Sequence, residues 1–168
     1  MNVKEFFSHI NFKRLLQYAL YMFLALITQN MLLTQLRPLG VCPMVLPAVA
    51  VAVGMFEGAS FGSVFSLLMG IFADMAFKEN TVMFTILFPA LSFTAGFVAQ
   101  FFINRRFFAY MGASVIGFLV TGTVQMLSTV ALDEGLWSPV MLSTMLLQTL
   151  WSVPFAVPAY YPPAEWIE

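Results

Sequence analysis

Apolar residues run through the chain in long stretches, which are separated by short clusters of charged and turn-forming residues. A helix needs about 20 mainly apolar residues to cross a bilayer core of roughly 30 Å. The pattern predicts six membrane-spanning helices, at residues 15–34, 41–56, 59–77, 81–103, 107–132 and 139–161. We therefore expect a single transmembrane domain over residues 1–168, an all-α bundle of six helices with short connections.

The second of these spans is short, and the helix must be interrupted between the second and third spans. Read as one helix, residues 41–77 would be about 55 Å long at about 1.5 Å per residue, far too long for one crossing. We favour a hairpin that turns near Glu57–Ser60. A tilted or re-entrant second span is the alternative.

The composition of the chain also points to a membrane environment. The chain is 61% hydrophobic and 9% charged, whereas a soluble domain carries roughly 25% charged residues. It is therefore expected to be an integral membrane protein. A net charge of −1 gives no reason to expect a nucleic-acid partner. A single cysteine (Cys42) and a single histidine (His9) argue against an intramolecular disulfide, a thiolate metal cluster and a histidine-based catalytic triad. We expect no enzymatic activity and no cofactor.

The basic residues predict the orientation in the membrane. With the N-terminus inside, the inner segments hold five of the seven basic residues (Lys4, Lys13, Arg14, Arg105, Arg106), and the outer segments hold the other two (Arg37, Lys78). Basic residues concentrate on the cytoplasmic side of membrane proteins. Both termini are thus predicted to be cytoplasmic, with Arg105 and Arg106 in a cytoplasmic basic loop.

Small residues recur at intervals of four in the middle of the chain. The series, called the ladder below, is Gly54, Gly58, Gly62, Ser66, Gly70 and finally Asp74. Small residues four apart let membrane helices approach closely. Because a spacing of four drifts by about 40° per step on a helix, the ladder cannot form one straight seam. It predicts two helices that meet at a tight Glu57–Gly58 turn. Its faces then either pack the bundle itself or dock another membrane protein.

Asp74 lies about one helical turn from the outer end of the third span. A carboxylate is expensive at mid-bilayer and cheaper near an interface. In one interpretation it reaches the outer headgroups or pairs with Lys78. In the other it makes a buried polar contact with a neighbouring helix, at Gln125 or Gln148.

The stretch MFEGASFGSVFSLLMGIFAD, residues 55–74, resembles the core signature of the MreD family of bacterial rod-shape-determining membrane proteins. That signature has a proline-led apolar helix, a charged residue beside glycine, then glycines four apart and an aspartate. The matching residues are Pro43 or Pro47, Glu57, Gly58, Gly62, Gly70 and Asp74, with Ser66 where the family more often has glycine. Lys78–Thr81 stands where the family usually has a glycine.

The resemblance implies a non-enzymatic subunit of the cell-elongation machinery in the bacterial cytoplasmic membrane. It implies association with a bitopic MreC-like protein and, directly or indirectly, with MreB and the peptidoglycan synthases. The ladder residues with Glu57 would be its helix-packing or partner-binding site. Since the MreD fold is similar to the S-components of energy-coupling-factor vitamin transporters, an S-component-like bundle is expected, and a substrate-binding S-component is the alternative function. The few polar residues in the predicted outer loops favour the first.

Overall fold

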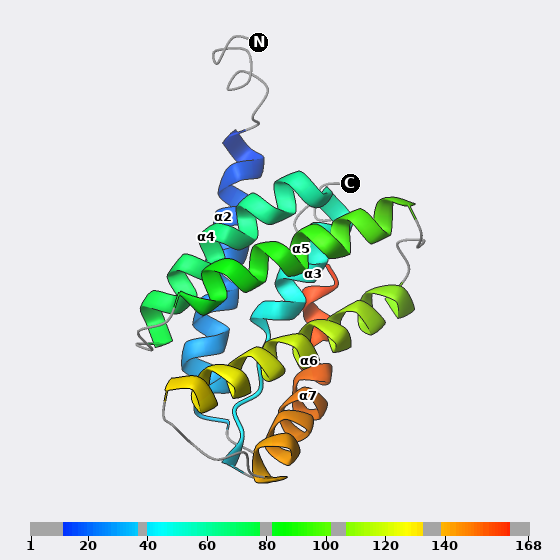
Figure 1. The fold of residues 1–168 in the computed structure, drawn as a ribbon. Helices are drawn as coiled ribbons and strands as arrows, with labels where there is room; N and C mark the ends of the chain where they lie inside the picture. The colour runs from blue at the N-terminus through cyan, green and yellow to red at the C-terminus, as the bar shows by residue number, and fades with distance from the viewer. Residues whose placement is uncertain (1–11, 37–39, 78–81, 102–106, 133–138, 162–168) are drawn as a thin grey trace.

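The computed structural model describes residues 12–36, 40–77, 82–101, 107–132 and 139–161, and these residues form a helical bundle (Figure 1). The first helix, α2 (Phe12–Ile27), continues into the π-helix η1 (Thr28–Leu33). The others are α3 (Leu46–Glu57), α4 (Ala59–Phe77), α5 (Met83–Phe101), α6 (Phe107–Leu132) and α7 (Pro139–Ala159). The predicted all-α membrane fold is confirmed, and the predicted bounds of the third and fifth spans coincide with α4 and α6.

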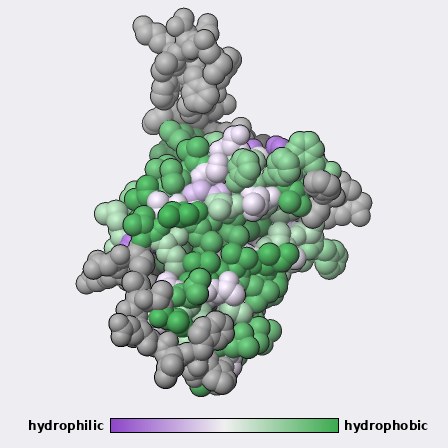
Figure 2. Space-filling view, in the orientation of Figure 1, coloured by the Kyte–Doolittle hydropathy of each residue, from purple (hydrophilic) through white to green (hydrophobic). Residues whose placement is uncertain are grey.

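Five of these helical segments are long and apolar enough to cross a membrane. Their outward side chains are apolar as well: Met75, Ile86 and Phe108 are each more than 70% exposed. Figure 2 shows the result on one face, where hydrophobic residues cover most of the surface of the described segments. Large contiguous apolar surfaces are rare on soluble monomers. The chain is thus a multi-pass membrane protein.

Helix α3 forms the centre of the bundle. Every residue from Leu46 to Met55 is buried, and α3 contacts each of α2, α4, α5, α6 and α7. Its side chains are mostly alanine and valine, which occupy little space. Neighbouring helices can therefore approach it on all sides, and a helix that is apolar all round belongs in a core.

The second predicted span, 41–56, is helical only in its second part. Helix α3 begins at Leu46, and residues 41–45 are neither helix nor turn. Pro43 and Pro47 explain the late start, because proline disfavours helical geometry in the residue before it and is accepted in the first turn of a helix. Twelve residues of helix cover about 18 Å, too little for a crossing. The non-helical segment, at most about 16 Å long, lies between the start of α3 and the end of the bundle where α7 begins (Figure 1).

The predicted turn between the second and third spans is confirmed. Helix α3 ends at Glu57, Gly58 adopts a φ of +96°, and α4 begins at Ala59. Residues with a side chain rarely adopt such a φ, so glycine suits this position. Four residues to either side of the turn, Gly54 and Gly62 meet: a Cβ on Gly62 would lie 2.6 Å from the Gly54 Cα atom.

Helix α5 covers the rest of the ladder. A Cβ on Gly54 would lie 2.2 Å from the Ser92 carbonyl oxygen, and one on Gly70 would lie 2.5 Å from that of Phe84. Ser66 is fully buried between these positions. A helix that crosses its neighbour at an angle can follow a row of residues four apart. Of the two interpretations, internal packing therefore holds at Gly54, Gly62 and Gly70.

Tyrosine hydroxyls join the helix ends on one side of the bundle. Tyr21 in α2 donates to the Ala159 carbonyl oxygen at 3.0 Å, and Tyr110 in α6 donates to that of Ala156 at 2.8 Å. The last carbonyls of a helix lack partners within it, so these bonds cap α7. The same side of the bundle holds the first half of α2, the end of α7 and the Glu57–Gly58 turn, because Tyr18 donates to Glu57. The predicted basic loop, Arg105 and Arg106, lies outside the described residues.

Substitution of Gly62 by alanine tests this packing. The added methyl group would overlap the Gly54 backbone and the Ser92 hydroxyl, so we expect the free energy of unfolding to fall by about 1–3 kcal/mol, as for other overpacked cores. Gly112→Ala is the matched control, because nothing lies within 4 Å of its added Cβ. Unfolding in detergent, followed by circular dichroism, measures both. Equal stability of the two variants would contradict the close contact between Gly54 and Gly62.

Candidate functional site

Gln29 holds the non-helical segment that leads into α3. Its Nε2 donates to the Pro43 carbonyl oxygen at 3.1 Å, and its Oε1 accepts from the Val45 backbone N–H at 2.8 Å. Gln29 is completely buried, as is Pro43. A non-helical backbone at membrane depth is tolerated only where its polar groups find partners inside the protein. The side chain of Gln29 provides two of them.

Ser152 contacts the same segment from the opposite side. Its hydroxyl accepts from the Met44 backbone N–H at 2.8 Å and donates to the Gln148 carbonyl oxygen at 2.6 Å. The segment is therefore joined to α7 as well as to the first helix. Gln29 itself lies in η1, where the wider helical turn changes the direction of the side chains. Short π-helical insertions often occur at functional positions.

Asp74 caps the N-terminus of α5. Its two carboxylate oxygens accept from the backbone N–H groups of Phe84 (3.0 Å) and Thr85 (2.8 Å), and from the Thr85 hydroxyl (2.6 Å). The first N–H groups of a helix lack partners within it and attract negative charge. The interpretation as a polar contact to a neighbouring helix is right, but the proposed partners, Gln125 and Gln148, are wrong. Lys78 lies outside the described residues.

The remaining predicted site residues divide into two groups. Glu57 is half-buried at the end of α3 and accepts from Tyr18, while the adjacent Gly58 forms the turn. Ser66 is buried, and its hydroxyl has no hydrogen-bond partner among the described residues. These residues, with Gly62 and Gly70, do not surround a common cavity. They line the contacts of α4 with its own neighbours.

A groove opens between α5 and α6. These two helices make little direct contact, and the cavity between them measures about 480 Å³. Val51 and Met55 of the central helix form its floor. Its walls carry many small residues, namely Ala95 and Ala99 of α5 and Ala109, Gly112, Ala113 and Gly117 of α6. Small residues allow close approach of a further helix in lipid.

Within the described ranges, no group of three or more histidine, cysteine, aspartate or glutamate side chains is placed to hold a metal ion.

The comparisons with known proteins give no relative. No family model, curated protein or solved structure matches this chain. Functional arguments therefore depend on the residues and their geometry.

Sequence reasoning missed the importance of Gln29 and Ser152. Both residues lie in mainly apolar helices, and their partners are backbone groups. One signal was present: two prolines, Pro43 and Pro47, follow Gln29 within 18 residues. Prolines predict a break in the helix, and a break inside the membrane requires a polar side chain nearby.

Replacement of Gln29 by leucine tests the α3 entry. The Val45 N–H and the Pro43 carbonyl would stay buried without partners, at a cost of about 1–3 kcal/mol for each group. Gln17→Leu on the same helix is the matched control, because its Oε1 is buried without a partner among the described residues. Unfolding in detergent should show a large decrease in the free energy of unfolding for Gln29→Leu and no decrease for Gln17→Leu. A larger decrease for Gln17→Leu than for Gln29→Leu would contradict the hydrogen bonds of Gln29.

Asp74→Asn tests the cap on α5. An amide keeps one acceptor oxygen and loses the other together with the charge, so we expect a loss of about 1–3 kcal/mol in stability. Thr85→Val removes only one of the three donors and should cost less. Hydrogen exchange at the first amides of α5 should accelerate in Asp74→Asn. Unchanged exchange there would show that the carboxylate does not cap this helix.

Proposed function

We propose that this protein is a non-enzymatic subunit of the bacterial cell-elongation machinery in the cytoplasmic membrane. In this role it works by helix–helix association with the single membrane-spanning helix of an MreC-like protein. Through that partner it is linked to MreB and the peptidoglycan synthases. The proposal joins the MreD-like signature at residues 55–74 with a surface suited to a further helix.

The observation that carries the proposal is the groove between α5 and α6. The glycines of the ladder are covered by the protein's own helices, as Gly62 and Gly70 are by α3 and α5. Gly112 in the groove is not covered: it is exposed, and a Cβ there would meet nothing within 4 Å. Membrane helices associate through such small, closely packing surfaces and not through hydrophobicity. The groove therefore suits the side chains of one more apolar helix.

The signature residues have a different part in this proposal. Gly58 turns the chain, and Gly54, Gly62 and Gly70 bring α3, α4 and α5 together. They position α5 and so one wall of the groove. Their effect on the partner would be indirect, through the shape of the bundle.

We further propose that the side with the Glu57–Gly58 turn faces the cytoplasm. The first residues of α2, which include the exposed Lys13, and the end of α7 lie on this side. Basic residues near helix ends favour a cytoplasmic position. Asp74 and the start of α5 would then face the outside.

Filling the groove tests the proposal. Gly112→Leu should fold normally, since the space beside Gly112 is open, but its side chain would occupy the partner's position. Ala90→Leu is the matched control, because Ala90 is exposed on α5 and does not line the groove. Each variant is expressed in place of the wild-type protein, and the MreC-like protein that co-purifies from membranes is measured together with cell shape.

We expect Gly112→Leu to lose at least tenfold in captured partner, more than about 1.4 kcal/mol in association free energy, and to produce rounded cells. Ala90→Leu should behave as the wild type. Capture of the MreC-like protein by Gly112→Leu at wild-type levels would contradict this docking surface. Co-purification of ATP-binding transport subunits in its place would contradict the cell-elongation function and favour the S-component alternative.

A further inference from the structure

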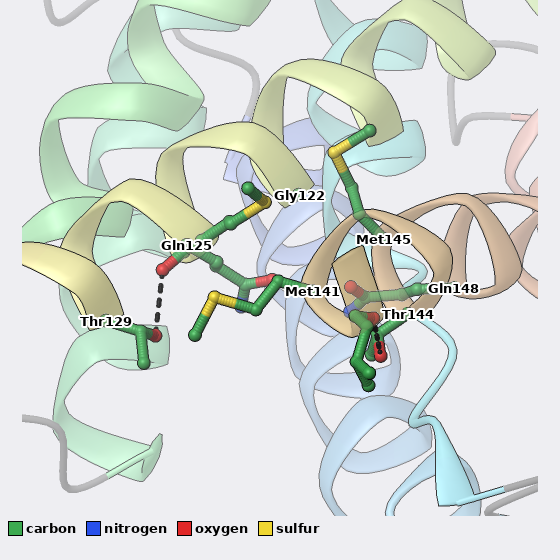
Figure 3. A pocket seen from close by; sticks show the side chains of 9 residues that line it. Gly122, Gln125, Thr129, Met141, Thr144, Met145 and Gln148 are labelled. Atoms are coloured by element: carbon green, nitrogen blue, oxygen red, sulfur yellow. Dashed lines mark hydrogen bonds between the residues drawn. The ribbon is translucent and has the colours of Figure 1, made fainter. Parts of the chain in front are cut away.

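A second cavity lies between α6 and α7, away from the groove and from the ladder. It measures about 320 Å³, which falls at the small end of the range for ligand pockets. Figure 3 shows the side chains around it, which come from the second half of α6 and the first half of α7. Besides Gly122 and Val140 they are two glutamines, two threonines and three methionines: Gln125, Gln148, Thr129, Thr144, Met126, Met141 and Met145.

The two glutamines leave their amide groups available. In Figure 3 the side chains of Gln125 and Gln148 extend toward the space between the two helices. Neither amide group has a hydrogen-bond partner among the described residues, although the backbone carbonyl oxygens of both residues accept from nearby hydroxyls. Each amide offers two N–H donors and one acceptor oxygen.

Both glutamines lie well inside their helices, where an amide group without a hydrogen-bond partner is energetically unfavourable. Gln125 lies seven residues before the end of α6, and Gln148 nine residues after the start of α7. At about 1.5 Å per residue, both lie roughly 10–14 Å from the helix ends. Polar groups in an apolar environment are unfavourable unless they form hydrogen bonds. Gln29 shows the contrast, since both ends of its amide are paired within the protein.

The residues that line the cavity also indicate that its ligand is uncharged. None of the nine lining residues is acidic, basic or a histidine, so an ionised ligand would find no counter-charge among these described residues. The threonine hydroxyls donate to backbone carbonyls, Thr129 to Gln125 at 3.0 Å and Thr144 to Val140 at 2.8 Å. Their oxygens can therefore still accept. The three methionines provide an adaptable apolar wall.

From these observations we propose that the cavity between α6 and α7 binds the uncharged, hydroxyl-bearing group of a small ligand through Gln125 and Gln148. A hydroxyl group donates to an amide or threonine oxygen and accepts from an amide N–H. The methionines contact the aliphatic part. Such a group comes from a neutral lipid of the acylglycerol type or from a free polyol. The proposal does not depend on the cell-elongation function, because the groove for the partner lies on other residues.

Three probes separate the possibilities in the delipidated, full-length protein. Monooleoylglycerol carries two free hydroxyls on an acyl chain, oleate carries the same chain with a charge, and glycerol carries hydroxyls without the chain. Occupancy is measured by native mass spectrometry and by the shift of the unfolding temperature. The variants are Gln125→Leu, Gln148→Leu and the double variant, with Gln100→Leu as the control, because Gln100 is exposed and lies outside the cavity.

We expect monooleoylglycerol to bind the wild type and Gln100→Leu, to bind the double variant about tenfold more weakly and to bind each single variant at intermediate strength. Binding of monooleoylglycerol without glycerol identifies a lipid, and binding of glycerol by itself identifies a free polyol; either supports the proposal. Oleate that binds equally well, or uncharged probes whose binding is absent or insensitive to both glutamines in variants that fold, would overturn it.

Discussion

The structure depends on one requirement, that backbone N–H and carbonyl groups inside the bilayer find partners in the protein. The requirement is most severe at residues 41–45, which are not helical and lie against the core. Gln29 and Ser152 meet it by bonding the Pro43 carbonyl and the N–H groups of Met44 and Val45. Asp74 does the same for the start of α5, and Tyr21 and Tyr110 for the end of α7. These polar side chains thus complete helix ends and the non-helical segment before α3.

Because the segment before α3 is held from two sides, a short helix can occupy the centre of the bundle. Its alanines and valines leave room for five neighbours, and Gly54, Gly62 and Gly70 let α4 and α5 approach to backbone distance. The same close packing leaves α5 and α6 apart and opens the groove above Val51 and Met55. The central helix is therefore the link between the capped helix ends and the surface proposed for the partner.

Apolar run lengths predicted the spans well, since lipid imposes length and apolarity on every crossing. They failed at residues 41–45, because apolar residues in a non-helical segment against the core look like those in a helix. The turn at Gly58 was predictable from the impossible length of one helix. The partners of Asp74 were not, since spacing along the chain does not show that its carboxylate meets the backbone of Phe84 and Thr85. Gln29 was recognisable only as a polar residue, because Pro43 and Pro47 signal a break in the helix but not which side chain bonds the backbone there.

The central claim, that a non-helical segment inside the bundle is held by Gln29, is tested most directly by amide hydrogen exchange at Met44 and Val45. Both N–H groups bond to buried side chains, so in wild-type protein in lipid nanodiscs they should exchange as slowly as the amides of α3. In Gln29→Leu the Val45 amide should exchange at least tenfold faster, while the amides in the middle of α4 should be unchanged. Fast exchange at Met44 and Val45 in the wild type, as in a solvent-exposed loop, would contradict the account.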